Sequence, residues 1–325
     1  MITSCLSRYF VGFFAILVLA GCSTTPPVDP PTSANTPAPA VAETATTLPT
    51  LLPVADTAVP TPAASPIPFQ RIRNIHYNSA QLPDQKLDVY TPNPVVGLTP
   101  VILTVHGGGG DKGNFSRFAI HFTELGYAVV SINYREMPKY TYPAPMDDTF
   151  CALAWIYANA DQYQFDTRHI AAVGHSLGGT FVAALGTMAE SSPFIEHCPY
   201  PLPDEHIVQA VVTFTGVFDY QASTDSLLHY YTDFFGASPE DAPELWKNAS
   251  PATWVDSGTP PFLLIHGAND TNILPEHSVN FAAELADADV EHQLLIIPNA
   301  SHNTIIDRAA SYQAVAEFLY TAFKR

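Results

Sequence analysis

The chain has 325 residues, with 13 basic against 31 acidic side chains and a formal net charge of −18. A surplus of negative charge of this size disfavours nucleic acid and anionic membrane surfaces as partners. It favours solubility and says nothing about the fold.

The first 21 residues have the pattern of an export signal. Arg8 supplies a positive charge, and Tyr9 to Ala20 form an apolar stretch that is too short for a spanning helix. The stretch closes with Leu19-Ala20-Gly21-Cys22, which resembles the lipobox of bacterial lipoproteins. The resemblance implies a signal peptide over residues 1–21 and a Cys22 that carries fatty acyl chains (palmitate), facing the periplasm or the cell exterior. The alternative is an ordinary secretory signal that is cut near Ala20 or Gly21.

Residues 22–67 are rich in Pro, Thr and Ala and have no amphipathic period. Such a segment buries too little apolar area to offset its ordering entropy, so we expect a disordered tether. Residues 68–325 then form one domain that is large enough for a sizeable core.

Strand and helix patterns alternate through this domain, after an antiparallel pair at Arg71–Tyr77 and Lys86–Tyr90. The expected strands are 101–105, 127–132, 169–173, 208–214, 261–266 and 291–297, and the expected helices are about 115–125, 146–160, 178–189, 276–286 and 311–323. We treat 163–168 as a polar connection. The alternation predicts an α/β fold with a mainly parallel, doubly wound sheet and helices on both faces. The aromatic-rich stretch Gly216–Thr259 interrupts it, either as a lid over the site or as a helical insertion on the core.

The most specific motif is Gly174-His175-Ser176-Leu177-Gly178, which lies between an apolar strand and a helix. A serine between two glycines at a strand-to-helix turn is typical of a nucleophile elbow. In that turn the Ser176 hydroxyl points away from the sheet, above the N-terminus of the next helix, where negative charge is stabilised.

A serine nucleophile needs a histidine as base and a carboxylate to orient it. Asp270 follows the strand 261–266, and His302 follows the strand 291–297, so the order Ser, Asp, His is that of α/β-hydrolases. We therefore predict a triad of Ser176, Asp270 and His302.

Other acidic and histidine side chains are weaker candidates. We expect Asp256, Asp287 and Asp289 to be solvated, His266 to end a strand, and His175 to point away from the attacking oxygen. The remaining histidines lack carboxylate or cysteine neighbours at metal-ligand spacing, so we predict no metal and no cofactor.

His106-Gly107-Gly108-Gly109-Gly110 follows the strand 101–105. Glycines allow backbone N–H groups to approach a carbonyl oxygen closely, as an oxyanion hole requires. We predict the N–H groups of Gly108, Gly109 and Leu177 as its donors.

From about residue 68 onward the chain resembles α/β-hydrolases of the carboxylesterase type, close to hormone-sensitive-lipase-like and feruloyl-esterase-like enzymes. The resemblance rests on the collinear stretches LDVYTP, HGGG, YAVVSINYR, YPAPMDD, the elbow, PPFLLIHG and Ser301-His302. Two departures stand out. Gly110 replaces a frequent aromatic residue, and the elbow reads His-Ser-Leu instead of the Glu-Ser-Ala or Asp-Ser-Ala of the first group.

These features predict a serine hydrolase that cleaves carboxylic esters through an acyl-enzyme. The substrate is a small molecule or an ester linked to a polysaccharide, and the oligomeric state stays open. One alternative is a peptidase of the prolyl-oligopeptidase type, although no propeller domain precedes the catalytic region. Another is a non-catalytic binding protein on a hydrolase scaffold. Cys151 and Cys198 remain in the mature chain either as a disulfide or as two free buried thiols.

Overall fold

The computed structural model describes residues 67–188, 193–203, 207–223 and 225–324. The predicted signal peptide, with Cys22, and all but the last residue of the predicted tether lie outside the described residues. In the described part, no helix is long and apolar enough to cross a membrane.

Eight strands form one sheet in the order β1-β2-β4-β3-β5-β6-β7-β8. The pairs β1–β2 and β2–β4 are antiparallel, and all the other pairs are parallel. The strands are β1 (Phe69–His76), β2 (Lys86–Pro92), β3 (Thr99–Val105), β4 (Ala128–Ile132), β5 (Phe165–His175), β6 (Ala210–Phe214), β7 (Phe262–Gly267) and β8 (His292–Ile297). The predicted fold, an antiparallel opening pair followed by a parallel doubly wound sheet, is confirmed.

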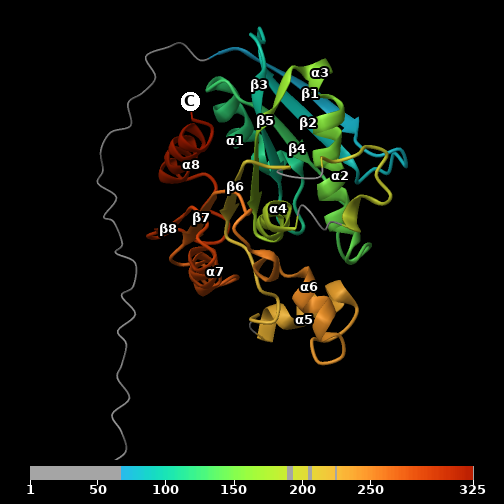
Figure 1. The fold of residues 1–325 in the computed structure, drawn as a ribbon, viewed down its shortest axis with the longest axis vertical. Helices are drawn as coiled ribbons and strands as arrows, with labels where there is room; N and C mark the ends of the chain where they lie inside the picture. Colours follow the sequence, from blue (N-terminus) through green and yellow to red (C-terminus); the bar gives the residue numbers. More distant parts are fainter. Residues whose placement is uncertain (1–66, 189–192, 204–206, 224, 325) are drawn as a thin grey trace, which may run out of the picture. The chain divides into compact units, whose positions relative to one another are not determined.

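Helices cover both faces of the sheet (Figure 1). They are α1 (Ser116–Glu124), α2 (Ala144–Ala158), α3 (Ala160–Tyr163), α4 (Leu177–Thr187), α5 (Asp225–Phe235), α6 (Pro243–Ala249), α7 (Glu276–Asp287) and α8 (Ala309–Ala322). Short 3₁₀ turns lie at η1 (Lys112–Phe115), η3 (Pro193–Ile195) and η4 (Pro251–Trp254). Phe118 of α1 and Phe318 of α8 belong to one apolar cluster, and Phe150 of α2 and Phe181 of α4 belong to another on the opposite face. The sheet is therefore buried on both sides, as its apolar strands require.

The connection predicted at 163–168 is wrong except at Gln164, because α3 ends at Tyr163 and β5 begins at Phe165. Phe165 pairs with Thr99, and the register shifts before Ile170 pairs with Val101. The polar side chains that suggested a loop form hydrogen bonds with one another within the strand. The Asp166 carboxylate accepts hydrogen bonds from Arg168 Nε at 3.0 Å and from His169 Nδ1 at 2.9 Å.

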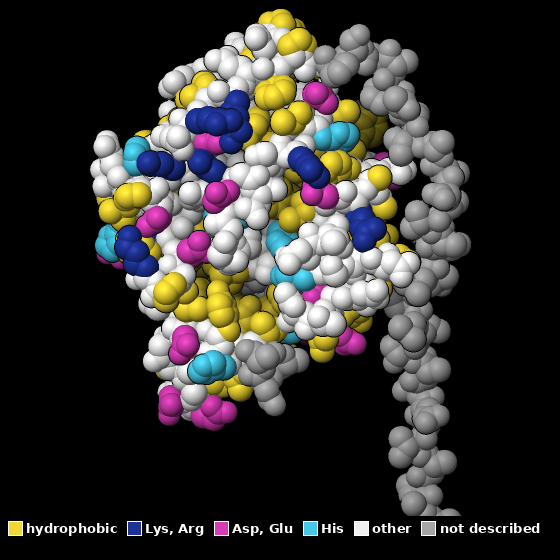
Figure 2. Space-filling model, turned by 180° about the vertical axis from the view of Figure 1, so that it is seen from behind, with side chains coloured by type: hydrophobic (Ala, Val, Ile, Leu, Met, Phe, Trp, Pro, Cys, Tyr) yellow, Lys and Arg dark blue, Asp and Glu magenta, His cyan; other side chains and the backbone are white. Residues whose placement is uncertain are grey.

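The stretch 216–259 contains α5, α6 and η4, which lie together beyond α4 (Figure 1). Its aromatic side chains pack on one another: the ring of Tyr220 lies 5.0 Å from Phe235, and the ring of Phe235 lies 4.9 Å from Trp246. Seen from behind, hydrophobic side chains gather where this lobe meets the rest of the domain (Figure 2). The segment packs on the core and also borders the candidate active site.

Candidate active site

Ser176 occupies the turn between β5 and α4. Its φ of 56° is a left-handed value that a non-glycine residue rarely adopts. A Cβ on Gly174 would overlap the backbone of Gly178, and a Cβ on Gly178 would overlap the carbonyl of Val105. Both flanking positions therefore need glycine, and the serine side chain is presented at the carboxyl end of the sheet.

The structure brings the three predicted triad residues together. Ser176 Oγ lies 2.9 Å from His302 Nε2, and His302 Nδ1 lies 2.8 Å from Asp270 Oδ2. An ionised carboxylate only accepts hydrogen bonds, so Nδ1 carries the proton and Nε2 is free to accept from the serine hydroxyl. This tautomer is the one that a base toward Ser176 requires.

Asp270 is held as an anion at the carboxyl end of β7. Burial of its side chain raises its pKa, but the side chains of His266 and His302 and the N–H of Ile273 outweigh that effect and hold the pKa well below its usual range. Oδ1 accepts from the N–H groups of Asn272 at 2.9 Å and Ile273 at 3.0 Å. Oδ2 faces His302 Nδ1 at 2.8 Å, and His266 Nε2 also lies 3.5 Å from it.

The acidic and histidine side chains that the sequence made weaker candidates lie outside the triad. Asp256 is exposed and accepts from the N–H of Gly258 at 2.8 Å, while Asp287 and Asp289 are exposed at the end of α7. His266 is fully buried, with Nδ1 at 2.7 Å from Ser278 Oγ and Nε2 at 2.9 Å from the carbonyl of Ile273. Each of these groups is engaged locally or solvated, as their places at strand ends and turns indicated.

The predicted oxyanion loop, residues 106–110, lies directly against the elbow. A Cβ on Gly107 would stand 3.0 Å from the Cβ of Ser176. Among the described residues, no hydrogen-bond partner takes the N–H of Gly108 or of Leu177, two of the three predicted donors. The third differs from expectation, because the N–H of Gly109 donates to Glu136 Oε2 at 2.8 Å. The loop turns at Gly109, whose φ is 72°, and this turn directs the amide toward the carboxylate.

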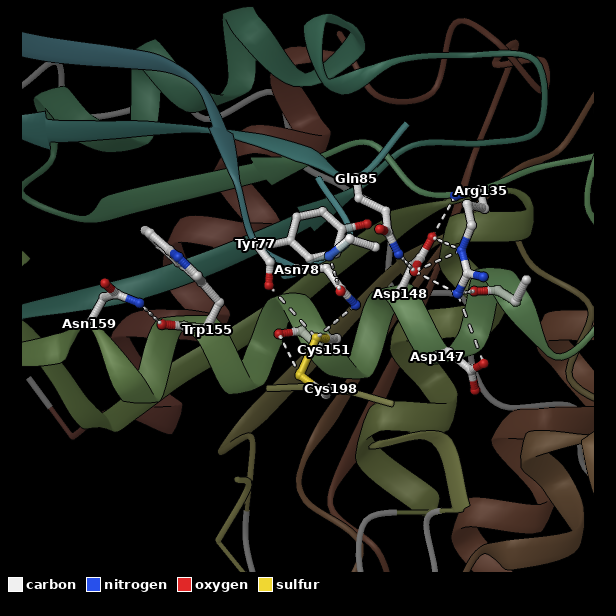
Figure 3. Close-up of a disulfide and its surroundings, with 12 residues drawn as sticks. Tyr77, Asn78, Gln85, Arg135, Asp147, Asp148, Cys151, Trp155, Asn159 and Cys198 are labelled. Atoms are coloured by element: carbon white, nitrogen blue, oxygen red, sulfur yellow. Dashed lines mark hydrogen bonds and ion pairs between the residues drawn. A yellow bond between two sulfur atoms is a disulfide. The ribbon is translucent and has the colours of Figure 1, made fainter. Parts of the chain in front are cut away.

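The spacing of the sequence motifs does not predict two contacts near the site. His175 donates from Nε2 to the carbonyl oxygen of His302 at 2.8 Å, and burial lowers its pKa to about 4. Arg135 donates from Nε and from its backbone N–H to the Asp148 carboxylate, at 2.9 and 2.7 Å from Oδ2 (Figure 3). The second contact fixes the loop that carries Glu136.

Cys151 and Cys198 form a disulfide with a Cα–Cα distance of 5.4 Å (Figure 3). Cys151 lies in the middle of α2, and Cys198 lies after η3 in the segment that follows the elbow helix. The bond ties this segment to the helix on the same face as α4. Of the two alternatives that the sequence left open, the structure contains the bridge.

Within the described ranges, no group of three His, Cys, Asp or Glu side chains is placed to hold a metal ion. The polar groups at the site are instead a nucleophile, a base, a carboxylate and backbone donors. This set is suited to nucleophilic attack on a carbonyl group.

A model of the BD-FAE family matches residues 87–285, which is more than half of the chain. The chain belongs to the BD-FAE family. Esterase LipQ of Mycobacterium tuberculosis is 31% identical over 70% of this chain and 56% of its own length. Esterase LipC of the same organism is 30% identical over 73% of this chain and 62% of its own length. The chain thus spans about three fifths of the length of these two relatives.

Solved structures show the same fold. A truncated carbohydrate esterase from gut microbiota has a TM-score of 0.68 at 23% identity, covering 81% of this chain and 99% of its own. A bifunctional GH43-CE protein of Bacteroides eggerthii has a TM-score of 0.72 at 25% identity, covering 78% of this chain and 35% of its own. This BD-FAE family member therefore has the α/β-hydrolase fold that the sequence resemblance implied.

Proposed function

We propose that this chain is a serine hydrolase that cleaves carboxylic esters through an acyl-enzyme. The observation that carries the proposal is the pair of hydrogen bonds that links Ser176 Oγ to His302 and His302 to Asp270. The relatives named esterases support the substrate class.

The proposed reaction has two halves. Ser176 Oγ attacks the ester carbonyl carbon while its proton moves to His302 Nε2, and negative charge develops on the carbonyl oxygen. His302 then gives that proton to the alcohol as the C–O bond breaks, which leaves the acyl group on Ser176. A water molecule repeats the sequence, with His302 as base, and releases the acid. Asp270 stabilises the imidazolium that forms in each half, and backbone N–H groups stabilise the oxyanion.

Two finer proposals concern where the enzyme acts and on what. The Leu19-Ala20-Gly21-Cys22 pattern supports an acylated Cys22 and a bacterial membrane lipoprotein that faces the periplasm or the cell exterior. The similarity to a structure named a carbohydrate esterase supports esters linked to polysaccharides beside small free esters.

The test is hydrolysis of nitrophenyl esters of increasing acyl length, run beside acetylated polysaccharide, feruloylated polysaccharide and a peptide anilide. We expect the wild type to hydrolyse esters. Ser176→Ala should lower this turnover by several orders of magnitude, because the triad acts as a unit, and should leave the fold intact. A fluorophosphonate should label the wild-type chain at Ser176 and leave the variant unlabelled. Turnover that survives Ser176→Ala, or cleavage of the anilide alone, contradicts the proposal.

A further inference from the structure

The candidate oxyanion hole holds one free amide fewer than the sequence suggests, because Glu136 accepts the N–H of Gly109. Burial raises the pKa of Glu136 and the Gly109 hydrogen bond lowers it, with burial the larger effect. When ionised, Glu136 also opposes negative charge on a nearby substrate oxygen. A further neutral donor at this place would therefore matter for catalysis.

The side chain of Tyr230 extends from α5 to this loop. A Cβ built on Gly108 would lie 3.2 Å from Tyr230 Oη and 3.8 Å from Leu177 Cδ2. The tyrosine hydroxyl thus lies beside Gly108, which the Leu177 side chain also approaches, and among the described residues the amides of both this glycine and this leucine are free. In the described part of the chain, no group forms a hydrogen bond with Tyr230 Oη.

Tyr230 packs on a buried neighbour on one side and stays protonated. Its ring lies 5.3 Å from that of Tyr231 at an interplanar angle of 81°, and Tyr231 is buried. Tyr230 itself is 36% exposed, so a substrate can reach it. Burial, and then the charge of Glu136, raise the pKa of Tyr230, so the hydroxyl remains a hydrogen-bond donor at neutral pH.

We propose that Tyr230 is a catalytic residue whose hydroxyl, with the N–H groups of Gly108 and Leu177, donates a hydrogen bond to the oxyanion. This inference rests on the proposed ester hydrolysis and adds a donor from the 216–259 insertion to the site. Because the donor belongs to α5, the insertion takes part in the chemistry as well as bordering the site.

The test compares Tyr230→Phe, which keeps the ring and removes the hydroxyl, with Tyr320→Phe on the exposed face of α8. We expect Tyr230→Phe to lower kcat on nitrophenyl acetate by about 10- to 100-fold with little change in KM, since a donor to the oxyanion acts in the transition state. A trifluoromethyl ketone, which forms a tetrahedral adduct with Ser176, should bind more weakly by a similar factor. Tyr320→Phe should leave kcat, KM and the inhibitor affinity unchanged.

The outcomes separate the two proposals. Unchanged kcat and inhibitor affinity in Tyr230→Phe, with an active wild type, overturn the role of Tyr230 and leave the ester hydrolase intact. A rise in KM with an unchanged kcat also overturns the role of Tyr230, because the tyrosine then only shapes the pocket. A wild type that hydrolyses no ester and takes up no fluorophosphonate overturns the proposed function and this inference with it.

Discussion

The ring of His175 donates a hydrogen bond from Nε2 to the backbone carbonyl of His302 at 2.8 Å. The residue before the candidate nucleophile thereby holds the loop of the candidate base, and the two rings lie 4.8 Å apart. The geometry between Ser176 and His302 is thus supported from the elbow itself. Burial favours the neutral form of His175, and the single ring proton of that form lies on Nε2, where it is donated to the carbonyl.

The first prediction is a pH dependence of stability. The pKa of His175 is about 4 in the folded chain and near 6.5 when unfolded, so the unfolded state binds more protons between these values. Stability from this group is therefore complete above about pH 6.5 and is lost as the pH falls toward 4. Buried His106, whose pKa is also about 4, acts in the same direction, and Asp147, whose pKa burial raises to about 6, acts in the opposite one.

A difference measurement isolates His175 from the other groups. His175→Gln keeps an amide that can donate to the His302 carbonyl but does not titrate. Urea unfolding from pH 4 to pH 7 should give a shallower slope of unfolding free energy against pH than in the wild type. His229→Gln, at an exposed position on α5, is the control and should keep the wild-type slope. Identical slopes in all three proteins would show that His175 does not titrate as proposed.

The second prediction concerns the partners of Ser176. His302→Ala should lower kcat by about 10⁴-fold or more, and Asp270→Asn should cost less, because Asp270 orients the base and does not transfer a proton. Ester turnover under saturating substrate measures both. Asp287→Asn, at an exposed carboxylate, is the matched control and should retain activity. If Asp256→Asn loses most activity while Asp270→Asn stays active, the carboxylate that orients His302 is Asp256 and our prediction of Asp270 is wrong.

The sequence predicts most of the architecture because apolar strands and helices repeat with clear periods. It also predicts the order of Ser176, Asp270 and His302, since each follows the end of a recognisable strand. It fails where polar side chains satisfy one another inside a strand. Asp166 and Arg168 look like loop residues, yet their ion pair lets the backbone continue in β5.

Contacts between loops are the other part that spacing does not predict. Glu136 follows β4 and Gly109 follows the neighbouring β3, and their hydrogen bond exists only because parallel pairing puts both strand ends at one edge. Tyr230 lies far along the chain and reaches Gly108 through the packing of α5. Such approaches depend on tertiary structure, and no local motif records them.

The third prediction concerns membrane anchoring. Cys22→Ser should abolish acylation and move the enzyme to the soluble fraction with its ester hydrolysis intact, because the proposed anchor lies in a segment separate from the candidate site. Fractionation of cells and mass spectrometry of the mature N-terminus measure the effect. Cys5→Ser, within the proposed signal peptide, is the control and should leave both the acylation and the location unchanged. An unmodified N-terminus in the wild type would refute the anchor.

The fourth prediction concerns the bond between Cys151 and Cys198, which are 47 residues apart in sequence. In the chain-entropy model, closing a loop of this size stabilises the folded state by about 4 kcal/mol, less any strain. A reductant should therefore lower the urea midpoint of the oxidised wild-type protein while leaving that of the Cys151→Ala/Cys198→Ala variant unchanged. Because Cys198 lies outside the triad, the double variant should hydrolyse esters at the wild-type rate below its unfolding midpoint. Two titratable thiols in the unfolded, unreduced wild type would mean that the segment after η3 is held to α2 by packing alone.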